Sequence, residues 1–150
     1  MIREIAYGSP LYHRTVAFRE EHLRRPLGLM NSAADLAEED KQIHIAAIDG
    51  EEVLSTVVLK PLSPKLVKLR QMAVAPALRG SGLGGELVRF AESIAWGRGY
   101  ATMEMAARVS ARGFYERLGY SAVGSEFVDI TIPHIKMTKN RDCEPGSIMS

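Results

Sequence analysis

The chain has 150 residues, 46% of them apolar and 25% charged, and its formal net charge is +1. This length and composition predict a single globular domain over residues 1–150. The near-neutral charge argues against a nucleic-acid partner, and no apolar stretch approaches the roughly 20 residues that cross a bilayer, so no membrane partner is expected either.

The first part of the chain predicts a strand followed by helices. Residues 2–7 are typical of a short strand. Ser9 stands before Pro10 in the pattern of a helix N-cap, which predicts a helix over 10–25. A second, short helix is expected over 31–40.

The middle of the chain changes to a strand pattern. Residues 42–49 and 51–62 are rich in β-branched residues and flank Asp49-Gly50, a strong signal for a hairpin turn. Residues 65–74 predict a further strand.

The second half alternates strands and helices. A helix is expected from Leu83 to about Gly97, because its apolar residues recur with a period near 3.6. After it come a strand over 100–107, a helix over 110–118, strands over 120–128 and 130–138, and a frayed tail over 139–150.

Four glycines stand before the central helix, in the segment VAPALRGSGLGGELVRFAE that begins at Val74. One interpretation is the dinucleotide-binding pattern G-x-G-x-x-G, read from Gly80. Its context argues against it, because five residues separate Val74 from the first glycine. The acidic residue that should follow would be Glu104, inside a predicted strand rather than at its end.

The second interpretation begins at Arg79 and reads R-x-x-G-x-G before a helix. Backbone N–H groups of a glycine-rich turn and of a helix's first turn carry partial positive charge and favour an anion. Arg79 would add a full positive charge. The alternative is a tight turn without a ligand.

Two motifs resemble the GNAT superfamily of acyl-CoA-dependent N-acetyltransferases. The segment LRQMAVAPALRGSGLGGELVRFAESIAWGRGY is similar to the family's central motif, and MEMAARVSARGFYERLGYSAVG to its next strand and helix. The match covers about residues 67–124. It implies an α/β fold with a mixed, mostly antiparallel sheet of about seven strands, flanked by about four helices.

The resemblance also implies how the cosubstrate acetyl-CoA is held. The backbone of Met72, Ala73 and Val74 would bind the pantetheine arm and polarise the thioester carbonyl. The pyrophosphate would be held by the loop residues Arg79, Gly80, Ser81, Gly82, Leu83 and Gly84.

Tyr115 matches the tyrosine that often protonates the departing CoA thiolate in this family, and the alternative is a core aromatic paired with Phe114. Many members carry an Asn or Gln near the end of the strand that follows the central helix, where this chain has Ala107 and Arg108. The missing amide puts one contact in doubt, although Arg108 could reach a phosphate or an acidic substrate.

No motif identifies the base that deprotonates the amine. Glu104 is a candidate because a carboxylate inside an apolar strand is costly to bury unless it has a partner or a function. His134 in the final strand is another candidate. Both have ordinary structural alternatives: an ion pair for Glu104 and a backbone hydrogen bond for His134.

The charged segment FREEHLRRP has two interpretations. It either forms a solvated helix face, or one of Arg19, Arg24 and Arg25 selects an acidic substrate. We predict no metal site, because the histidines lack metal-ligand spacing and Cys143, the only cysteine, is remote from them. A lone cysteine also favours a reducing, cytoplasmic location.

These observations predict direct transfer of an acetyl group from acetyl-CoA to a primary amine of a small molecule or a peptide. The alternative is an acyl-CoA-binding or sensing module without transfer activity. The resemblance also suggests a homodimer, an assembly common in this family.

Overall fold

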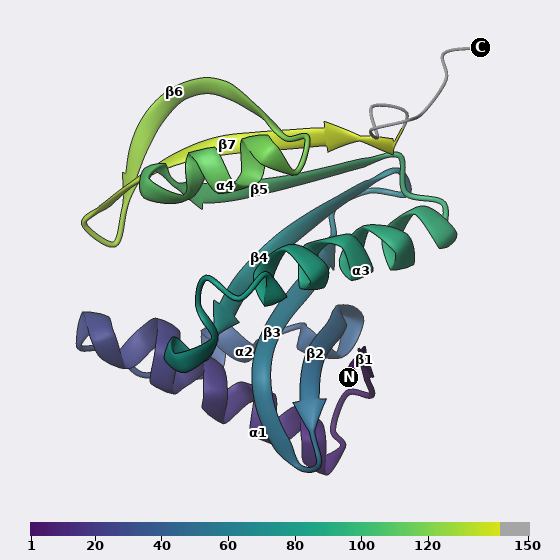
Figure 1. Ribbon diagram of the computed structural model, residues 1–150, viewed down its shortest axis with the longest axis vertical. Coiled ribbons are helices and arrows are strands. Elements are labelled where there is room, and N and C mark those ends of the chain that lie inside the picture. Colours follow the sequence, from purple (N-terminus) through teal and green to yellow (C-terminus); the bar gives the residue numbers. More distant parts are fainter. Residues whose placement is uncertain (142–150) are drawn as a thin grey trace. The chain divides into compact units, whose positions relative to one another are not determined.

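Seven strands form one sheet in the computed structural model, which describes residues 1–141 (Figure 1). Their order is β1-β2-β3-β4-β5-β7-β6. Two compact units make up the chain. The first comprises Met1–Lys60 with Leu69–Ser93, and the second comprises Pro61–Lys68 with the chain from Ile94 onward.

The elements follow the predicted order. The strands are β1 (Ile2–Ile5), β2 (Ile43–Asp49), β3 (Glu52–Pro61), β4 (Leu66–Val74), β5 (Thr102–Arg108), β6 (Ser121–Asp129) and β7 (Ile132–Asn140). The α-helices are α1 (Pro10–Arg19), α2 (Ala33–Leu36), α3 (Leu83–Gly97) and α4 (Arg112–Arg117). The pairs β1–β2, β2–β3, β5–β7 and β6–β7 are antiparallel and β4–β5 is parallel, so the predicted mixed α/β fold is confirmed.

Helix α1 begins as expected and ends early. The Ser9 side chain accepts a hydrogen bond from the Tyr12 N–H at 3.1 Å, and Pro10 occupies the first turn. The α-helical part stops at Arg19, and Glu20–Arg24 continue as a π-helix. The predicted helix over 10–25 is therefore helical throughout, but its last part is a wider π-helix and the first residue of a 3-10 turn rather than α-helix.

The first unit has its core between β1, α1 and β2. Ile5, Tyr12, Ala46 and Ile48 are buried together, and partly buried residues of α1 and β3 pack against them. The expected hairpin joins β2 to β3 through Gly50, whose φ of 63° suits glycine in such a turn.

In the second unit, β5 lies between two partners. It runs parallel to the start of β4 over Leu66–Lys68 and antiparallel to β7 over its whole length. Met103, Met105 and Ala107 are buried, whereas the residues between them are more exposed. This alternation gives β5 one buried face and one accessible face.

The hairpin of β6 and β7 ends the described chain. Figure 1 shows β6 bowing away from β7, where their register shifts between Val123 and Phe127. Strand β7 runs to Asn140, and Lys139 is buried, so these two residues differ from the predicted frayed tail. Cys143 lies outside the described residues. None of the helices within residues 1–141 has the length and apolar character that a membrane crossing requires.

Candidate functional site

The glycine-rich loop between β4 and α3 combines left-handed backbone with open space. Gly80 has a φ of 82° and Gly82 a φ of 92°, values that side chains rarely tolerate. A Cβ at either position would meet no heavy atom within 4 Å. The backbone conformation therefore requires these glycines, and their surroundings leave room for a ligand. Gly84 and Gly85 lie instead in the first turn of α3.

The loop is ordered by its own hydrogen bonds. Arg79 is exposed, and its Nε donates to the Val74 carbonyl at 3.3 Å. The Ser81 hydroxyl donates to the Leu78 carbonyl at 2.5 Å. Helix α3 begins two residues later, so its first N–H groups follow directly on the loop. A guanidinium and a helix N-terminus thus flank the same short segment, which is suited to an anion.

The end of β4 precedes this loop. Strand β4 pairs with β5 over Leu66–Lys68, and within the described chain Met72, Ala73 and Val74 lie beyond that ladder. Ala73 is buried, and its two neighbours are half-buried. The backbone of this segment is consequently outside the β4–β5 pairing.

Tyr115 lies in α4 of the second unit and is 8% exposed. Its ring makes edge contacts with Phe114 at 4.9 Å and with Tyr120 at 5.9 Å between centroids. Burial raises the pKa of the Tyr115 phenol to about 12, so the group is protonated at neutral pH. Tyr115 therefore packs as a core aromatic residue and also carries the proton that an acid would donate.

Glu104 is paired with a lysine. Its carboxylate lies 3.4 Å from the Nζ of Lys136 on β7, and its side chain is 17% exposed. The ion pair that was the alternative role for Glu104 is therefore present, with Lys136 as the partner.

His134 has one ring nitrogen engaged. Its Nδ1 lies 2.7 Å from the Ile132 carbonyl, and its ring stacks on Phe127 at 5.9 Å between centroids. A carbonyl only accepts, so Nδ1 carries the hydrogen in the neutral ring and Nε2 keeps its lone pair. This is the arrangement that a base requires.

The structure separates the three predicted catalytic residues into two groups. Glu104 and His134 occupy the accessible face of β5 and β7, where they lie four residues, or about 13 Å, apart along the strands. Tyr120, which follows α4, donates its hydroxyl to the sulfur of Met103 at 3.2 Å, so α4 covers the buried face. Tyr115 thus approaches the sheet from the opposite face.

Arg108 ends β5 directly opposite His134 and is exposed. It therefore shares the accessible face with both predicted bases. Over residues 1–141, no group of three or more His, Cys, Asp or Glu side chains is arranged to hold a metal ion.

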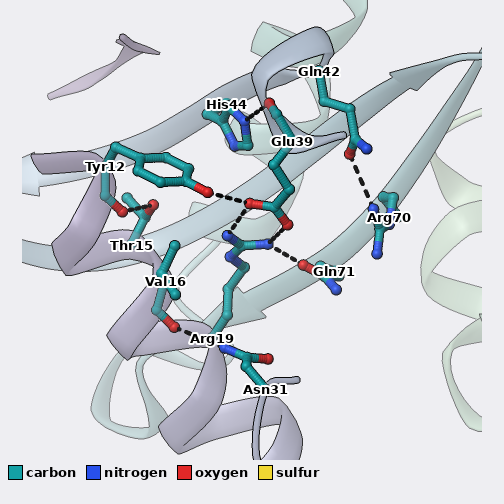
Figure 2. A network of polar contacts seen from close by, with 10 residues as sticks. All are labelled: Tyr12, Thr15, Val16, Arg19, Asn31, Glu39, Gln42, His44, Arg70 and Gln71. Carbon is teal, nitrogen blue, oxygen red and sulfur yellow. Dashed lines mark hydrogen bonds and ion pairs between the residues drawn. The ribbon is translucent and has the colours of Figure 1, made fainter. Parts of the chain in front are cut away.

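A buried polar network in the first unit was not anticipated from the sequence (Figure 2). Arg19 is 2% exposed, and both its terminal nitrogens donate to the Glu39 carboxylate at 2.8 Å. Tyr12 donates its hydroxyl to the same carboxylate at 2.7 Å, and Arg19 also donates to the side-chain oxygen of Gln71. Both interpretations of Arg19, as a solvated residue or as a selector of acidic substrates, are wrong because Glu39 neutralises it inside the protein.

The network shifts the pKa values of its members. Burial alone would raise the pKa of Glu39, but the hydrogen bonds from Arg19 and Tyr12 and the charge of Arg19 outweigh it and lower that pKa. Burial, together with the bond to Glu39, raises the pKa of Tyr12. His44 donates from Nε2 to the Glu39 carbonyl at 2.8 Å, and burial lowers its pKa despite that contact.

Comparison with known sequences gives a family match over most of the chain. The profile of the acetyltransferase (GNAT) domain matches residues 18–141. A Bacillus subtilis strain 168 protein provisionally named an acetyltransferase is 36% identical over 75 residues, 50% of this chain and 51% of that relative. The chain thus matches about half the length of this relative. YjcF of the same strain, named an uncharacterized N-acetyltransferase, is 29% identical over 103 residues, 68% of this chain and 73% of YjcF.

Solved structures share the fold. Escherichia coli ElaA superposes with a TM-score of 0.80 at 18% identity, covering 93% of this chain and 99% of ElaA. A GNAT acetyltransferase from Elizabethkingia anophelis, solved with acetyl-CoA bound, gives a TM-score of 0.69 at 16% identity, covering 93% and 97% of the two chains. The resemblance found in the sequence motifs and the predicted fold class are both confirmed.

Proposed function

Because this chain belongs to the GNAT family of acetyltransferases, we propose that it transfers an acetyl group from acetyl-CoA directly to a primary amine. The observation that carries the proposal is the loop before α3. It combines two left-handed glycines in open space, an exposed arginine and a helix N-terminus. That combination is suited to the pyrophosphate of a CoA ester.

The cosubstrate is held by two adjoining segments of the first unit. The loop residues Arg79, Gly80, Ser81, Gly82, Leu83 and Gly84 bind the pyrophosphate. The backbone of Met72, Ala73 and Val74 hydrogen-bonds the pantetheine arm as an added strand would. The position of these residues supports this role, because they lie beyond Leu66–Lys68, the part of β4 that pairs with β5.

The chemistry requires two proton transfers. The amine nitrogen attacks the thioester carbonyl, the C–S bond breaks, and the sulfur leaves as a thiolate that takes the Tyr115 proton. A backbone N–H of the Met72–Val74 segment stabilises the developing oxyanion. A phenol with a pKa of about 12 is a weak acid toward a free thiolate of pKa near 8.5. Burial of the thiolate raises its own pKa and reduces that difference.

His134 is our preferred base. Its Nε2 lone pair is left available by the bond from Nδ1 to the Ile132 carbonyl, whereas Glu104 is engaged by Lys136.

The two candidate bases differ in the expected effect of their removal. Replacing His134 by Gln should lower kcat about 100-fold, because it removes the group that accepts the amine proton. Replacing Glu104 by Gln should leave kcat within about threefold of the wild type. Steady-state rates measure both variants, and a large loss of kcat only in the Glu104 variant would reverse the assignment.

The acceptor that we propose is a small-molecule or peptide amine, and we place the reaction in the cytoplasm. Two features support an accessible acceptor side: His134 is half-buried, and its neighbour Arg108 is exposed. A screen of amines with acetyl-CoA, read by release of free thiol, identifies the class.

Calorimetric titration with acetyl-CoA, CoA and NAD tests the cosubstrate. We expect micromolar binding of both CoA compounds and none of NAD. Arg79→Glu should weaken CoA binding at least tenfold, because it places a negative charge beside the pyrophosphate. Arg112→Glu, which changes another exposed arginine, is the matched control and should bind as the wild type does.

The results separate the proposal from its alternatives. Absence of CoA binding would contradict an acetyltransferase, and preferential binding of NAD would restore the dinucleotide interpretation. Binding of CoA without acetylation of any amine would identify a module that senses acyl-CoA.

A further inference from the structure

Gln71 has an unusual backbone conformation for its position. Its φ is 53°, in the left-handed region, although it lies inside β4. The other non-glycine residues of the described chain with positive φ are Glu38, Ile130 and Thr131, and all three are in turns. A residue in this region persists only where its surroundings hold it there.

The side chain of Gln71 is held from the first unit's interior. Arg19 donates an Nη1 hydrogen bond to the Gln71 side-chain oxygen, as Figure 2 shows. Arg19 is itself immobilised, because Glu39 accepts from both of its terminal nitrogens and is fully buried. Tyr12 donates a further hydrogen bond to Glu39. The amide is therefore tied to a rigid group.

Because of where Gln71 lies in the chain, its hydrogen bond with Arg19 affects the backbone of the residues that follow it. Met72 follows directly and begins the segment whose backbone would bind the pantetheine arm. A change of φ at Gln71 from left-handed to extended would rotate the next peptide group and exchange the faces of the residues after it. The donors and acceptors of Met72–Val74 would then point elsewhere.

We propose that Arg19 and Glu39 are positioning residues, which hold Gln71 in the left-handed conformation and so set the direction of the Met72–Val74 backbone toward acetyl-CoA. This inference rests on the proposed function of that segment. A purely stabilising role explains the ion pair less well, since buried ion pairs can often be replaced by apolar residues without loss of stability.

Two substitutions of Gln71 separate its conformation from its amide. Gln71→Leu keeps the size of the side chain, removes the acceptor for Arg19, and retains the cost of a left-handed backbone. Gln71→Gly also removes the acceptor, but glycine adopts positive φ freely. We expect Leu to raise the Kd for acetyl-CoA roughly tenfold and Gly to change it less than about threefold.

Gln42 supplies a matched control. It is another glutamine of the first unit whose side-chain oxygen accepts from an arginine, Arg70, at 3.0 Å. Its φ is −111°, an ordinary extended value. Gln42→Leu should leave the Kd for acetyl-CoA unchanged.

Arg19→Lys tests the other side of the contact. Lysine keeps a positive charge beside Glu39 but has a single donor group in place of the forked guanidinium. We expect a Kd about fivefold higher than that of the wild type. In the double variant Arg19→Lys/Gln71→Gly this loss of affinity should disappear. A glycine at position 71 adopts the left-handed conformation without a hydrogen bond from residue 19. A merely structural role for Arg19 predicts no such rescue.

Titration calorimetry with acetyl-CoA measures every variant, and thermal unfolding verifies that each is folded. Failure of the wild type to bind acetyl-CoA would overturn the proposed function itself. Binding by the wild type with an unchanged Kd for Gln71→Leu and Arg19→Lys would overturn the positioning role alone. So would a Gln71→Gly variant that binds as weakly as Gln71→Leu.

Discussion

Arg19 illustrates how burial decides what a charged side chain can do. In the sequence it stands in a run of charges that is typical of a solvated helix face. In the structure it is 2% exposed and shares two hydrogen bonds with Glu39. Removing such a partner would leave a buried charge uncompensated, which costs about 3–5 kcal/mol. The neighbouring Arg25 is exposed, as expected of this face.

Replacement of Tyr115 by Phe tests its role as the acid. The variant keeps the ring and loses the proton donor, so kcat should fall about 100-fold while the Kd for acetyl-CoA changes less than about threefold. Because its pKa is about 12, Tyr115 stays protonated below about pH 10 and should cause no alkaline loss of kcat there. Stopped-flow assay of thiol release measures kcat.

The neighbouring Tyr120 provides the control for that variant. It is also buried, and its ring lies 5.9 Å from that of Tyr115. Tyr120→Phe should leave kcat within about threefold of the wild type. Equal activity of Tyr115→Phe and the wild type would leave Tyr115 with only a packing role.

At the scale of elements, the contact between β2 and the 3-10 turn before it buries a histidine in its neutral form. His44 on β2 donates from Nε2 to the carbonyl of Glu39, in the turn Glu39–Lys41. Its Nδ1 is buried without a hydrogen-bond partner among the described residues. Protonation would place an unpaired N–H inside the protein, so the folded state favours neutral His44.

The pKa of His44 predicts acid lability. Its folded pKa lies below the unfolded value of 6.5, so the unfolded state binds the proton more readily. The free energy of unfolding should therefore fall as the pH decreases from about 7 through the folded pKa, by at most about 1.4 kcal/mol per pH unit. Urea unfolding between pH 4 and 8 measures this slope.

Two variants isolate the contribution of His44. His44→Gln retains an N–H donor and cannot titrate, so its unfolding free energy should be flat from pH 7 to 5. Below about pH 4.5 the unfolding free energy of this variant should still fall because of Glu39. The folded pKa of Glu39 is lowered, so protonation of its carboxylate removes the stability that the charged form contributes. His13→Gln, which changes an exposed histidine, should keep the wild-type slope. A wild-type slope in His44→Gln would assign the acid loss to other groups.

At the scale of the whole molecule, acetyl-CoA binding should be visible as thermal stabilisation. A ligand at 100 times its Kd stabilises the native state by about 2.7 kcal/mol if the unfolded chain does not bind it. For a chain of this size that corresponds to a rise in Tm of about 5–10 °C. Differential scanning calorimetry with increasing acetyl-CoA measures it.

The loop variant gives the comparison for this prediction. Arg79→Glu should require at least tenfold more acetyl-CoA for the same rise in Tm, because the rise depends on the ratio of ligand concentration to Kd. An equal rise in both proteins would mean that Arg79 takes no part in binding.

Most of the element order was predictable because its signals are local. The glycine of the β2–β3 turn, the Ser9 cap and the apolar stripe of α3 each act within a few residues. Leu87 and Ala91 of that stripe are indeed buried. Boundaries were less predictable, as the π-helix after Arg19 and the extension of β7 to Asn140 show. For Asn140 the pairing with Thr102 of β5, far away in the chain, outweighs local propensity.

The sequence by itself determined the family, the order of strands and helices, and the glycine-rich loop before α3, since a dense run of glycines before an amphipathic helix is a local pattern. Only the tertiary structure decided the burial of Arg19 and the left-handed conformation of Gln71. The partners of Arg19 lie 20 and 52 residues away along the chain, at Glu39 and Gln71. No local pattern distinguishes a charge that meets such partners from one that faces water, because both are the same residue type on the same helix.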